Sequence, residues 1–381
     1  MRVVAGAVLF VVGCGAGGGT LAGAGGNMGM VMTGGGAISG GTLTGAGSNS
    51  GTPTGAGAAI GTGIGIGGVG NGPGGVTCGA VGRPAQPLPP DILIALDTSS
   101  SMNDDLGNAT CAGGCGQSSK WAAAAAAINS AVAATAGRVN WGLELFATKE
   151  ANLCGAFPGV NVDTFPASAV AIGDALHFLT MPNGGVYGGE TRQTRGAVDA
   201  ALARVMRRPS PGLRFMVLIT DGAPMCAPDG ISVADDTAVT AAAIAAATTT
   251  RTSTFVVGVA TGDGPADTSL LMMAEAGLGR DGGGLFRTST GDDIRAALNS
   301  VADQTAGCTF AVPEVSADGV QSRRHIGVAV DGAEVPRDTT RTNGWDYVDD
   351  TLASVRLYGS ACAAVTADFA VVTINFKCIL P

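Results

Sequence analysis

Three apolar runs of strand length mark the part of the chain that is expected to fold around a buried sheet. Residues 91–96, 213–220 and 254–259 are almost continuously hydrophobic. Such runs are typical of parallel strands buried on both faces, because neither face needs polar side chains. Two further strands are predicted at residues 139–146, where apolar positions alternate, and at residues 285–287, as a short edge strand.

The stretches between these runs predict helices, several of them rich in alanine. They cover residues 118–135, 168–179, 194–206, 233–249, 268–276 and 291–306. Ser118 or Ser119 is expected to cap the first of them. Strands that alternate with helices are joined by right-handed crossovers and form a mostly parallel sheet. We therefore predict an α/β domain over residues 91–306, with a doubly wound sheet.

The pattern changes after Cys308. Short apolar runs at residues 326–330, 355–358 and 371–376 are separated by Asp-Gly and Asn-Gly dipeptides, which are typical of turns. Residues 307–381 are therefore predicted to form a small β-rich appendage.

The segment before the predicted domain has a different composition. Residues 15–90 consist mainly of Gly, Thr, Ala and Ser and end in a proline-rich stretch, and they hold nearly half of the 63 glycines of the chain. Such a composition offers too little apolar surface to offset its ordering entropy, so a flexible linker is expected. Its Gly63-x-Gly65-x-x-Gly68 pattern would indicate dinucleotide binding only between a strand and a helix, and neither is predicted there.

The first 14 residues have the features of an export signal. Arg2 precedes a short apolar run over residues 3–12, which is too short to span a membrane. The run ends at Cys14 and resembles a bacterial lipobox, in which the cysteine is lipidated. We expect a lipoprotein signal peptide, with a plain secretory signal as the alternative. The expected location is extracytoplasmic and lipid-anchored, and Gly15 favours an outer-membrane or cell-surface position.

The remaining cysteines predict disulfides, because an even number follows an export signal. They are Cys78, Cys111, Cys115, Cys154, Cys226, Cys308, Cys362 and Cys378. Eight cysteines allow on the order of 100 pairings. Cys111 and Cys115 could close a tight loop, Cys154 and Cys226 could join two loops, and the other four could tie the end of the linker to the C-terminal segment. Zinc is the less favoured alternative, since Cys-x3-Cys has no second close pair.

The formal net charge of −9 bears on the class of partner. A phosphate backbone would be repelled, and the sequence has no stripe of Lys and Arg to override that average. Nucleic acid is therefore not expected as a partner.

Three short motifs bring hydroxyl and carboxylate side chains to the predicted sheet. The segment Asp97-Thr98-Ser99-Ser100-Ser101 follows the first buried strand, and Asp221 follows the strand at residues 213–220. Thr191 lies in a Gly-Gly-Glu-Thr loop just before a predicted helix. The crevice beyond the carboxyl ends of such strands is where doubly wound sheets bind ligands.

Together these motifs resemble the metal-ion-dependent adhesion site of the von Willebrand factor A (VWA) family. The resemblance covers about residues 91–306, and the C-terminal segment is similar to that of bacterial secreted relatives. It implies that Asp97, Ser99, Ser101, Thr191 and Asp221 hold Mg²⁺, or alternatively Mn²⁺ or Ca²⁺, with Thr194 replacing Thr191 if the loop register differs. Many relatives have glycine where Ser100 stands, so a positive φ at that position would strain the serine.

The resemblance implies binding of a protein that presents an acidic side chain to the metal. A metal-dependent hydrolase is disfavoured, because activation of water needs a general base. The chain has only His177 and His325, both remote in sequence from the motifs, and no Gly-x-Ser-x-Gly elbow. The third possibility is a structural envelope protein that binds no metal.

Overall fold

The computed structural model describes residues 81–147, 161–189, 192–225, 233–262, 264–314, 321–368 and 370–378. Cys14, Cys78, Cys154, Cys226, Glu190 and Thr191 lie outside these ranges. The predicted signal peptide and most of the predicted linker lie outside them as well. Among the described residues, no helix has both the length and the apolar character needed to cross a membrane.

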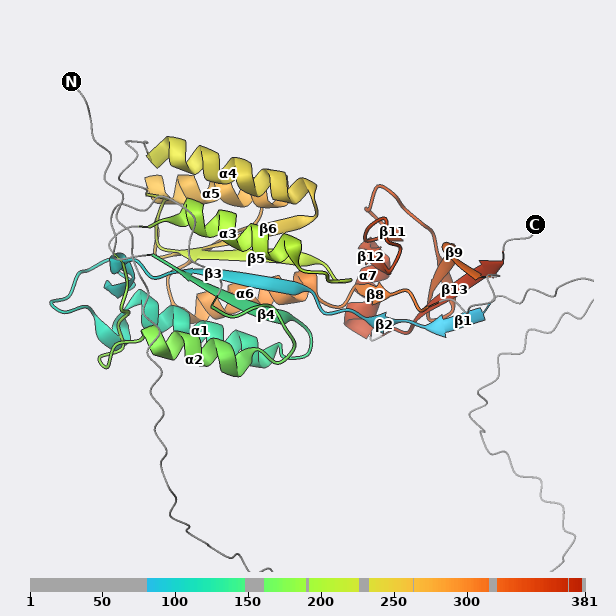
Figure 1. Ribbon diagram of the computed structural model, residues 1–381, viewed down its shortest axis with the longest axis horizontal. Coiled ribbons are helices and arrows are strands. Elements are labelled where there is room, and N and C mark those ends of the chain that lie inside the picture. Colours follow the sequence, from blue (N-terminus) through green and yellow to red (C-terminus); the bar gives the residue numbers. More distant parts are fainter. Residues whose placement is uncertain are drawn as a thin grey trace, which may run out of the picture. The chain divides into compact units, whose positions relative to one another are not determined.

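A parallel sheet of five strands forms the centre of the α/β part of the chain (Figure 1). Its strands are β3 (Asp91–Asp97), β4 (Asn140–Phe146), β5 (Arg214–Thr220), β6 (Thr252–Val259) and β7 (Leu285–Thr288). Their spatial order is β4-β3-β5-β6-β7, and every neighbouring pair is parallel. This confirms the predicted α/β fold class.

Six helices cover the two faces of this sheet (Figure 1). They are α1 (Lys120–Ala134), α2 (Ala169–Leu179), α3 (Thr194–Arg207), α4 (Val233–Thr249), α5 (Pro265–Leu278) and α6 (Gly291–Thr305). Ile92, Ile94 and Leu96 of β3 pack in one core cluster with residues of α1, α2 and α6. Leu93 and Ala95 point the other way and pack with residues of α3, α4 and α5. Successive side chains of β3 thus point to opposite faces of the sheet, and each face packs in its own core. This is why β3 has no polar residue between its ends.

The first helix begins where the sequence predicts. The Ser119 hydroxyl accepts a hydrogen bond from the backbone N–H of Ala122 at 3.1 Å, so Ser119 is the N-cap of α1. Between β3 and α1, a disulfide joins Cys111 to Cys115, which is the pairing that their short spacing favours.

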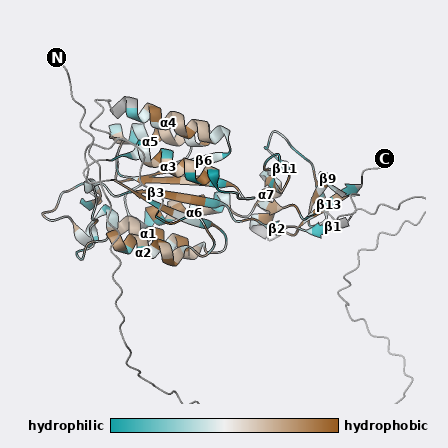
Figure 2. Ribbon diagram, in the orientation of Figure 1, coloured by the Kyte–Doolittle hydropathy of each residue, from teal (hydrophilic) through white to brown (hydrophobic). Residues whose placement is uncertain are grey.

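The C-terminal segment forms two four-stranded antiparallel sheets with a hydrophobic core of their own. One sheet has the order β1-β13-β9-β10 and the other β11-β12-β8-β2. The strands are β1 (Val81–Pro84), β2 (Gln86–Pro87), β8 (Thr309–Ala311), β9 (Gln321–Val330), β10 (Ala333–Val335), β11 (Gly344–Tyr347), β12 (Ser354–Tyr358) and β13 (Val372–Cys378). In Figure 2, apolar colour is concentrated in the central strands β3 and β6 of the α/β part, and it is weaker in these smaller sheets.

Two features of this segment differ from the sequence expectation. The end of the predicted linker is not free: β1 pairs with β13 and β2 pairs with β8. Their partners lie more than 200 positions away in sequence, so local composition could not reveal the pairing. The segment also contains a helix, α7 (Gly359–Asp368), where the sequence predicts only strands and turns. Cys362 in this helix forms a disulfide with Cys308, so that pair links two parts of the C-terminal segment.

Candidate metal site at the carboxyl ends of β3 and β5

The sheet itself brings the two predicted aspartates together. β3 ends at Asp97 and β5 ends at Thr220, and these strands are parallel neighbours with Leu96 opposite Ile219. Asp97 and Asp221 therefore emerge from adjacent strands at one edge of the sheet. This edge is where open α/β sheets bind ligands.

Asp97 is fully buried and is held by two hydrogen bonds. Its Oδ1 accepts from the backbone N–H of Ser99 at 2.7 Å, and its Oδ2 accepts from the Thr220 hydroxyl at 2.6 Å. Burial raises the pKa of Asp97 to about 6, and the neighbouring Asp221 carboxylate adds to the rise. The Arg192 guanidinium opposes it. A buried carboxylate beside a second carboxylate gains from a nearby cation.

The two serines connect the aspartates. The Ser99 and Ser101 hydroxyl oxygens are 3.1 Å apart, and the Ser101 hydroxyl donates to Asp221 Oδ1 at 2.9 Å. Between them, Ser100 opens a short 3₁₀ helix, η1 (Ser100–Asn103), and is not among the residues with positive φ. The strain considered for serine at this position therefore does not arise. The side-chain oxygens of Ser99, Ser101 and Asp221 thus form one connected group, and Asp97 is joined to it through the backbone N–H of Ser99.

The loop that carries the predicted threonine approaches the same group. The Gly189 N–H donates to the Thr98 carbonyl at 3.2 Å, and a Cβ on Gly188 would lie 1.7 Å from that carbonyl oxygen. The close approach explains why glycine stands at position 188. Thr191 itself falls outside the described residues. Its alternative, Thr194, is the first residue of α3; it is fully buried, and its hydroxyl has no hydrogen-bond partner in the described part of the chain.

Two basic side chains outside the predicted set of ligands face the aspartates. The Lys120 Nζ lies 2.9 Å from Asp221 Oδ2, with side-chain exposures of 3% and 1%. The Arg192 Nε lies 3.4 Å from Asp221 Oδ1 and 3.9 Å from Asp97 Oδ2. An Arg192 amino group also donates to the Ser101 hydroxyl at 3.3 Å. Position is the only sequence signal for either residue: Lys120 stands at the start of an alanine-rich helix, and Arg192 directly follows Thr191.

The oxygen atoms of this group suit a hard divalent cation. In an octahedral magnesium site with bonds of about 2.0–2.1 Å, neighbouring ligand oxygens are roughly 3 Å apart. The spacings of 3.1 Å between the serine oxygens and 2.9 Å from Ser101 to Asp221 match that edge length. Within the described ranges no cluster of three or more His, Cys, Asp or Glu side chains exists, so an ion here depends on the hydroxyls. The donors fit a metal, whereas the two carboxylate charges are already faced by Lys120 and Arg192.

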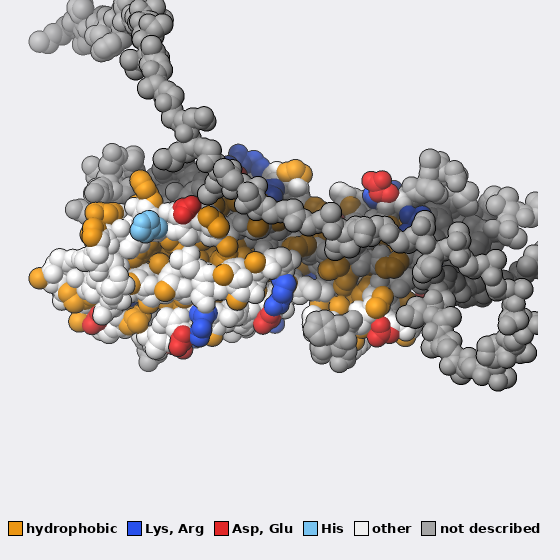
Figure 3. Space-filling view, turned by 90° about the horizontal axis from the view of Figure 1, so that it is seen from below, with side chains coloured by type: hydrophobic (Ala, Val, Ile, Leu, Met, Phe, Trp, Pro, Cys, Tyr) orange, Lys and Arg blue, Asp and Glu red, His pale blue; other side chains and the backbone are white. Residues whose placement is uncertain are grey.

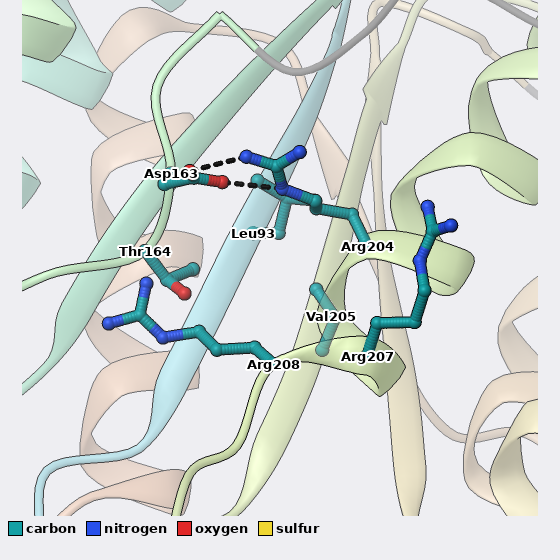
Figure 4. A pocket seen from close by; sticks show the side chains of 7 residues that line it. All are labelled: Leu93, Asp163, Thr164, Arg204, Val205, Arg207 and Arg208. Carbon is teal, nitrogen blue, oxygen red and sulfur yellow. Dashed lines mark hydrogen bonds and ion pairs between the residues drawn. The ribbon is translucent and has the colours of Figure 1, made fainter.

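A separate pocket lies beside α3. Its lining residues are Leu93, Asp163, Thr164, Arg204, Val205, Arg207 and Arg208 (Figure 4). Arg204 forms a bidentate ion pair with Asp163 across it, with Nε 2.6 Å from Asp163 Oδ1.

Glu144 of β4 is fully buried, and both of its carboxyl oxygens lack hydrogen-bond partners in the described part of the chain. Burial raises the pKa of Glu144 to about 8, and the charge of Arg204 opposes the rise.

One face of the molecule is shown in space-filling form in Figure 3. The acidic and basic side chains that are coloured there are scattered among hydrophobic and neutral polar surface. On this face they do not gather into a basic stripe of the kind that tracks a nucleic-acid backbone.

Comparison with known proteins gives structural likeness alone. No family model matches the chain, and no curated relative is found. Solved structures with a similar arrangement include the PilB minor pilin from Streptococcus sanguinis, at 12% identity over 57% of this chain and 61% of that chain, with a TM-score of 0.45. The pilus adhesin SpaC from Lactobacillus rhamnosus GG matches at 15% identity over 76% of this chain and 39% of its own, with a TM-score of 0.41.

Manganese-loaded TRAP protein from Plasmodium vivax matches at 12% identity over 68% of this chain and 93% of that chain, with a TM-score of 0.39. This chain thus spans less than two thirds of the PilB and SpaC chains. At these identities and scores the likeness says nothing about the site, so the case for a function depends on the residues themselves.

Proposed function

We propose that this chain is a VWA-like binding module, and that Asp97, Ser99, Ser101 and Asp221 hold one divalent cation, with Thr191 or Thr194 as a further ligand. The observation that carries the proposal is the convergence of these four side chains from two adjacent strand ends, with oxygen spacings of 3.1 and 2.9 Å. The donor set is all oxygen, which favours Mg²⁺ and allows Mn²⁺ or Ca²⁺.

The partner that we propose is a protein that presents an acidic side chain. When bound, the cation would supply a positive site at the sheet edge that a carboxylate of another protein can approach. Exposed apolar side chains lie on the loops around this edge: Tyr187 is 50% exposed and Met225 is 40% exposed. The backbone N–H of Met225 donates to the Arg192 carbonyl at 3.0 Å, which ties the loop after β5 to the site. Aromatic and Met side chains of this kind are enriched at protein interfaces.

We further propose that the protein acts by binding rather than by catalysis, outside the cytoplasm, on a membrane to which lipidated Cys14 anchors it. His177 lies in the last turn of α2 and His325 in β9. Neither histidine is hydrogen-bonded to Asp97, Ser99, Ser101 or Asp221 in the described part of the chain.

The test is calorimetric titration of the purified chain with Mn²⁺ and Mg²⁺. We expect one site per chain, lost in Asp221→Ala and kept in Asp292→Ala, which changes an exposed aspartate on α6. Capture of proteins from envelope extracts should then be abolished both by chelator and by Asp97→Ala. Metal binding that survives Asp221→Ala, or capture that persists unchanged under both treatments, would overturn the proposal.

A second candidate is a structural module that binds no metal. The observation that favours it is that Lys120 and Arg192 together match the charges of Asp97 and Asp221. The same titration separates the two candidates. Absence of both heat and thermal shift at millimolar Mn²⁺ would favour the structural module.

A further inference from the structure

Arg192 stands against the same oxygen atoms that are proposed to hold the metal. Its Nε is 3.4 Å from Asp221 Oδ1, and one of its amino groups is 3.3 Å from the Ser101 hydroxyl. A guanidinium and a divalent cation cannot both occupy the space in front of these atoms, because the two positive charges repel and the ligand oxygens are shared. We propose that Arg192 is a built-in competitor of the divalent cation, so that metal binds only as the guanidinium leaves. This inference rests on the proposed function and deepens it.

The residues around Arg192 leave space for its guanidinium and hold it by hydrogen bonds. A Cβ on Gly222 would lie 1.7 Å from an Arg192 terminal nitrogen, so the absence of a side chain at position 222 makes room for the guanidinium. That nitrogen also donates to the Ala223 carbonyl at 3.4 Å. The backbone carbonyl of Arg192 accepts from Met225, which fixes the start of its side chain at this loop.

Lys120 and Arg192 differ in how readily they can leave. Lys120 is 3% exposed and contacts Asp221 Oδ2 at 2.9 Å, so moving it would strand a buried ammonium and a buried carboxylate. Arg192 is 21% exposed, and its contacts with the two aspartates are longer, at 3.4 and 3.9 Å. Arg192 is therefore the exchangeable cation, while Lys120 is the permanent partner of Asp221 Oδ2. The metal is left with Oδ1 of Asp221.

The different roles of Lys120 and Arg192 determine how tightly the site binds a divalent cation. With both basic side chains in place, the two aspartates are matched in charge without a metal. A divalent cation must displace Arg192 and tolerate Lys120, so we expect weak binding that responds to the concentration of metal. An acidic partner that draws the freed guanidinium away would favour the metal-loaded site.

The test is Mn²⁺ titration of the full-length chain by calorimetry, with Arg192→Gln and two companion variants. Arg192→Gln should bind Mn²⁺ more tightly than wild type by about tenfold or more, since a positive charge next to the ion is removed. Gly222→Ala should also tighten Mn²⁺ binding, because the new methyl group displaces the Arg192 guanidinium. This variant keeps the positive charge of Arg192 in the chain. Gly222 is not among the positive-φ glycines, so its backbone accepts alanine. Arg195→Gln is the matched control on the first turn of α3 and should leave the affinity unchanged.

A second readout is the melting temperature. In chelator, Arg192→Gln should lower the melting temperature, because Asp97 and Asp221 lose one of their two counter-charges, and Mn²⁺ should restore it. Binding by Arg192→Gln but not by wild type would show that Arg192 blocks the site outright, and it would contradict the metal binding proposed for the wild-type chain. Equal Mn²⁺ affinity of wild type and Arg192→Gln would overturn the competition while leaving the metal site intact. Absence of binding in every variant would overturn both the competition and the proposed function.

Discussion

The Ser101 hydroxyl donates to Asp221 Oδ1 at 2.9 Å, across 120 positions of sequence. This contact joins the loop after β3 to the end of β5 and places a neutral oxygen donor against one carboxylate. A hydroxyl here serves a cation as a ligand, and it also serves the metal-free site as a hydrogen-bond donor.

Replacement of Ser101 by alanine is therefore expected to weaken metal binding. Removal of one of the proposed ligands should raise the Kd for Mn²⁺ by about tenfold, while the sheet stays intact because no core contact is lost. Calorimetric titration measures the Kd. Ser100→Ala is the matched control, since Ser100 is exposed and its side chain is not a proposed ligand. Equal losses in the two variants would show that the effect comes from the loop and not from the ligand.

Lys120→Met is expected to destabilise the fold. The ion pair with Asp221 is buried on both sides, so removal of the ammonium leaves an uncompensated buried carboxylate. The free energy of unfolding in urea should fall by about 3 kcal/mol. Lys377→Met removes an exposed ion pair with Glu334, which water and salt screen, and should cost much less. Asp221→Asn in the Lys120→Met background should recover part of the loss. A loss no larger than that of Lys377→Met would contradict the buried pair.

Glu144 should make the stability depend on pH. Its pKa is raised by burial to about 8 in the folded chain, against about 4.5 in the unfolded chain. Between these two pH values the carboxyl group of Glu144 is protonated in the folded state and ionised in the unfolded state. The free energy of unfolding is therefore highest below pH about 4.5 and falls as the pH rises toward 8. Glu144→Gln should remove this loss and stabilise the protein at pH 8 by on the order of 3 kcal/mol, with little effect at pH 4.5. Urea unfolding at the two pH values measures the difference. A benefit that is the same at both values would be inconsistent with a buried carboxyl that titrates.

The two described disulfides should contribute unequally to stability. Cys111–Cys115 closes a loop with a sequence separation of 4, and Cys308–Cys362 closes one with a separation of 54. The chain-entropy argument gives about 2 kcal/mol for the short loop and about 4 kcal/mol for the long one. Paired Cys→Ala variants, unfolded in urea without reductant, check the order. A larger loss for the short loop would indicate that loop entropy is not the main term.

Local patterns were sufficient to predict the central sheet and its helices. The apolar run after Asp91, the cap at Ser119 and the alanine-rich stretches each lie where an element begins or continues. The aspartates could be placed at one sheet edge because parallel strands end together. These are consequences of short-range pattern and of strand direction.

Other features depend on contacts that no local pattern records. Lys120 and Arg192 resemble ordinary surface side chains in the sequence, and their burial against Asp221 follows only from the packed loops. Val81 and Gln86 belong to strands because distant strands pair with them. The signal peptide, the lipidated Cys14 and the Thr191 ligand remain predictions from the sequence.

The central claim is that one divalent cation lies among Asp97, Ser99, Ser101 and Asp221. The most direct measurement is an anomalous difference map from crystals of the protein grown with millimolar Mn²⁺. We predict one peak within bonding distance of Ser99 Oγ, Ser101 Oγ and Asp221 Oδ1, with the Arg192 guanidinium moved away from Asp97 and Asp221. A map with no peak at these atoms, and Arg192 still against both aspartates, would contradict the account.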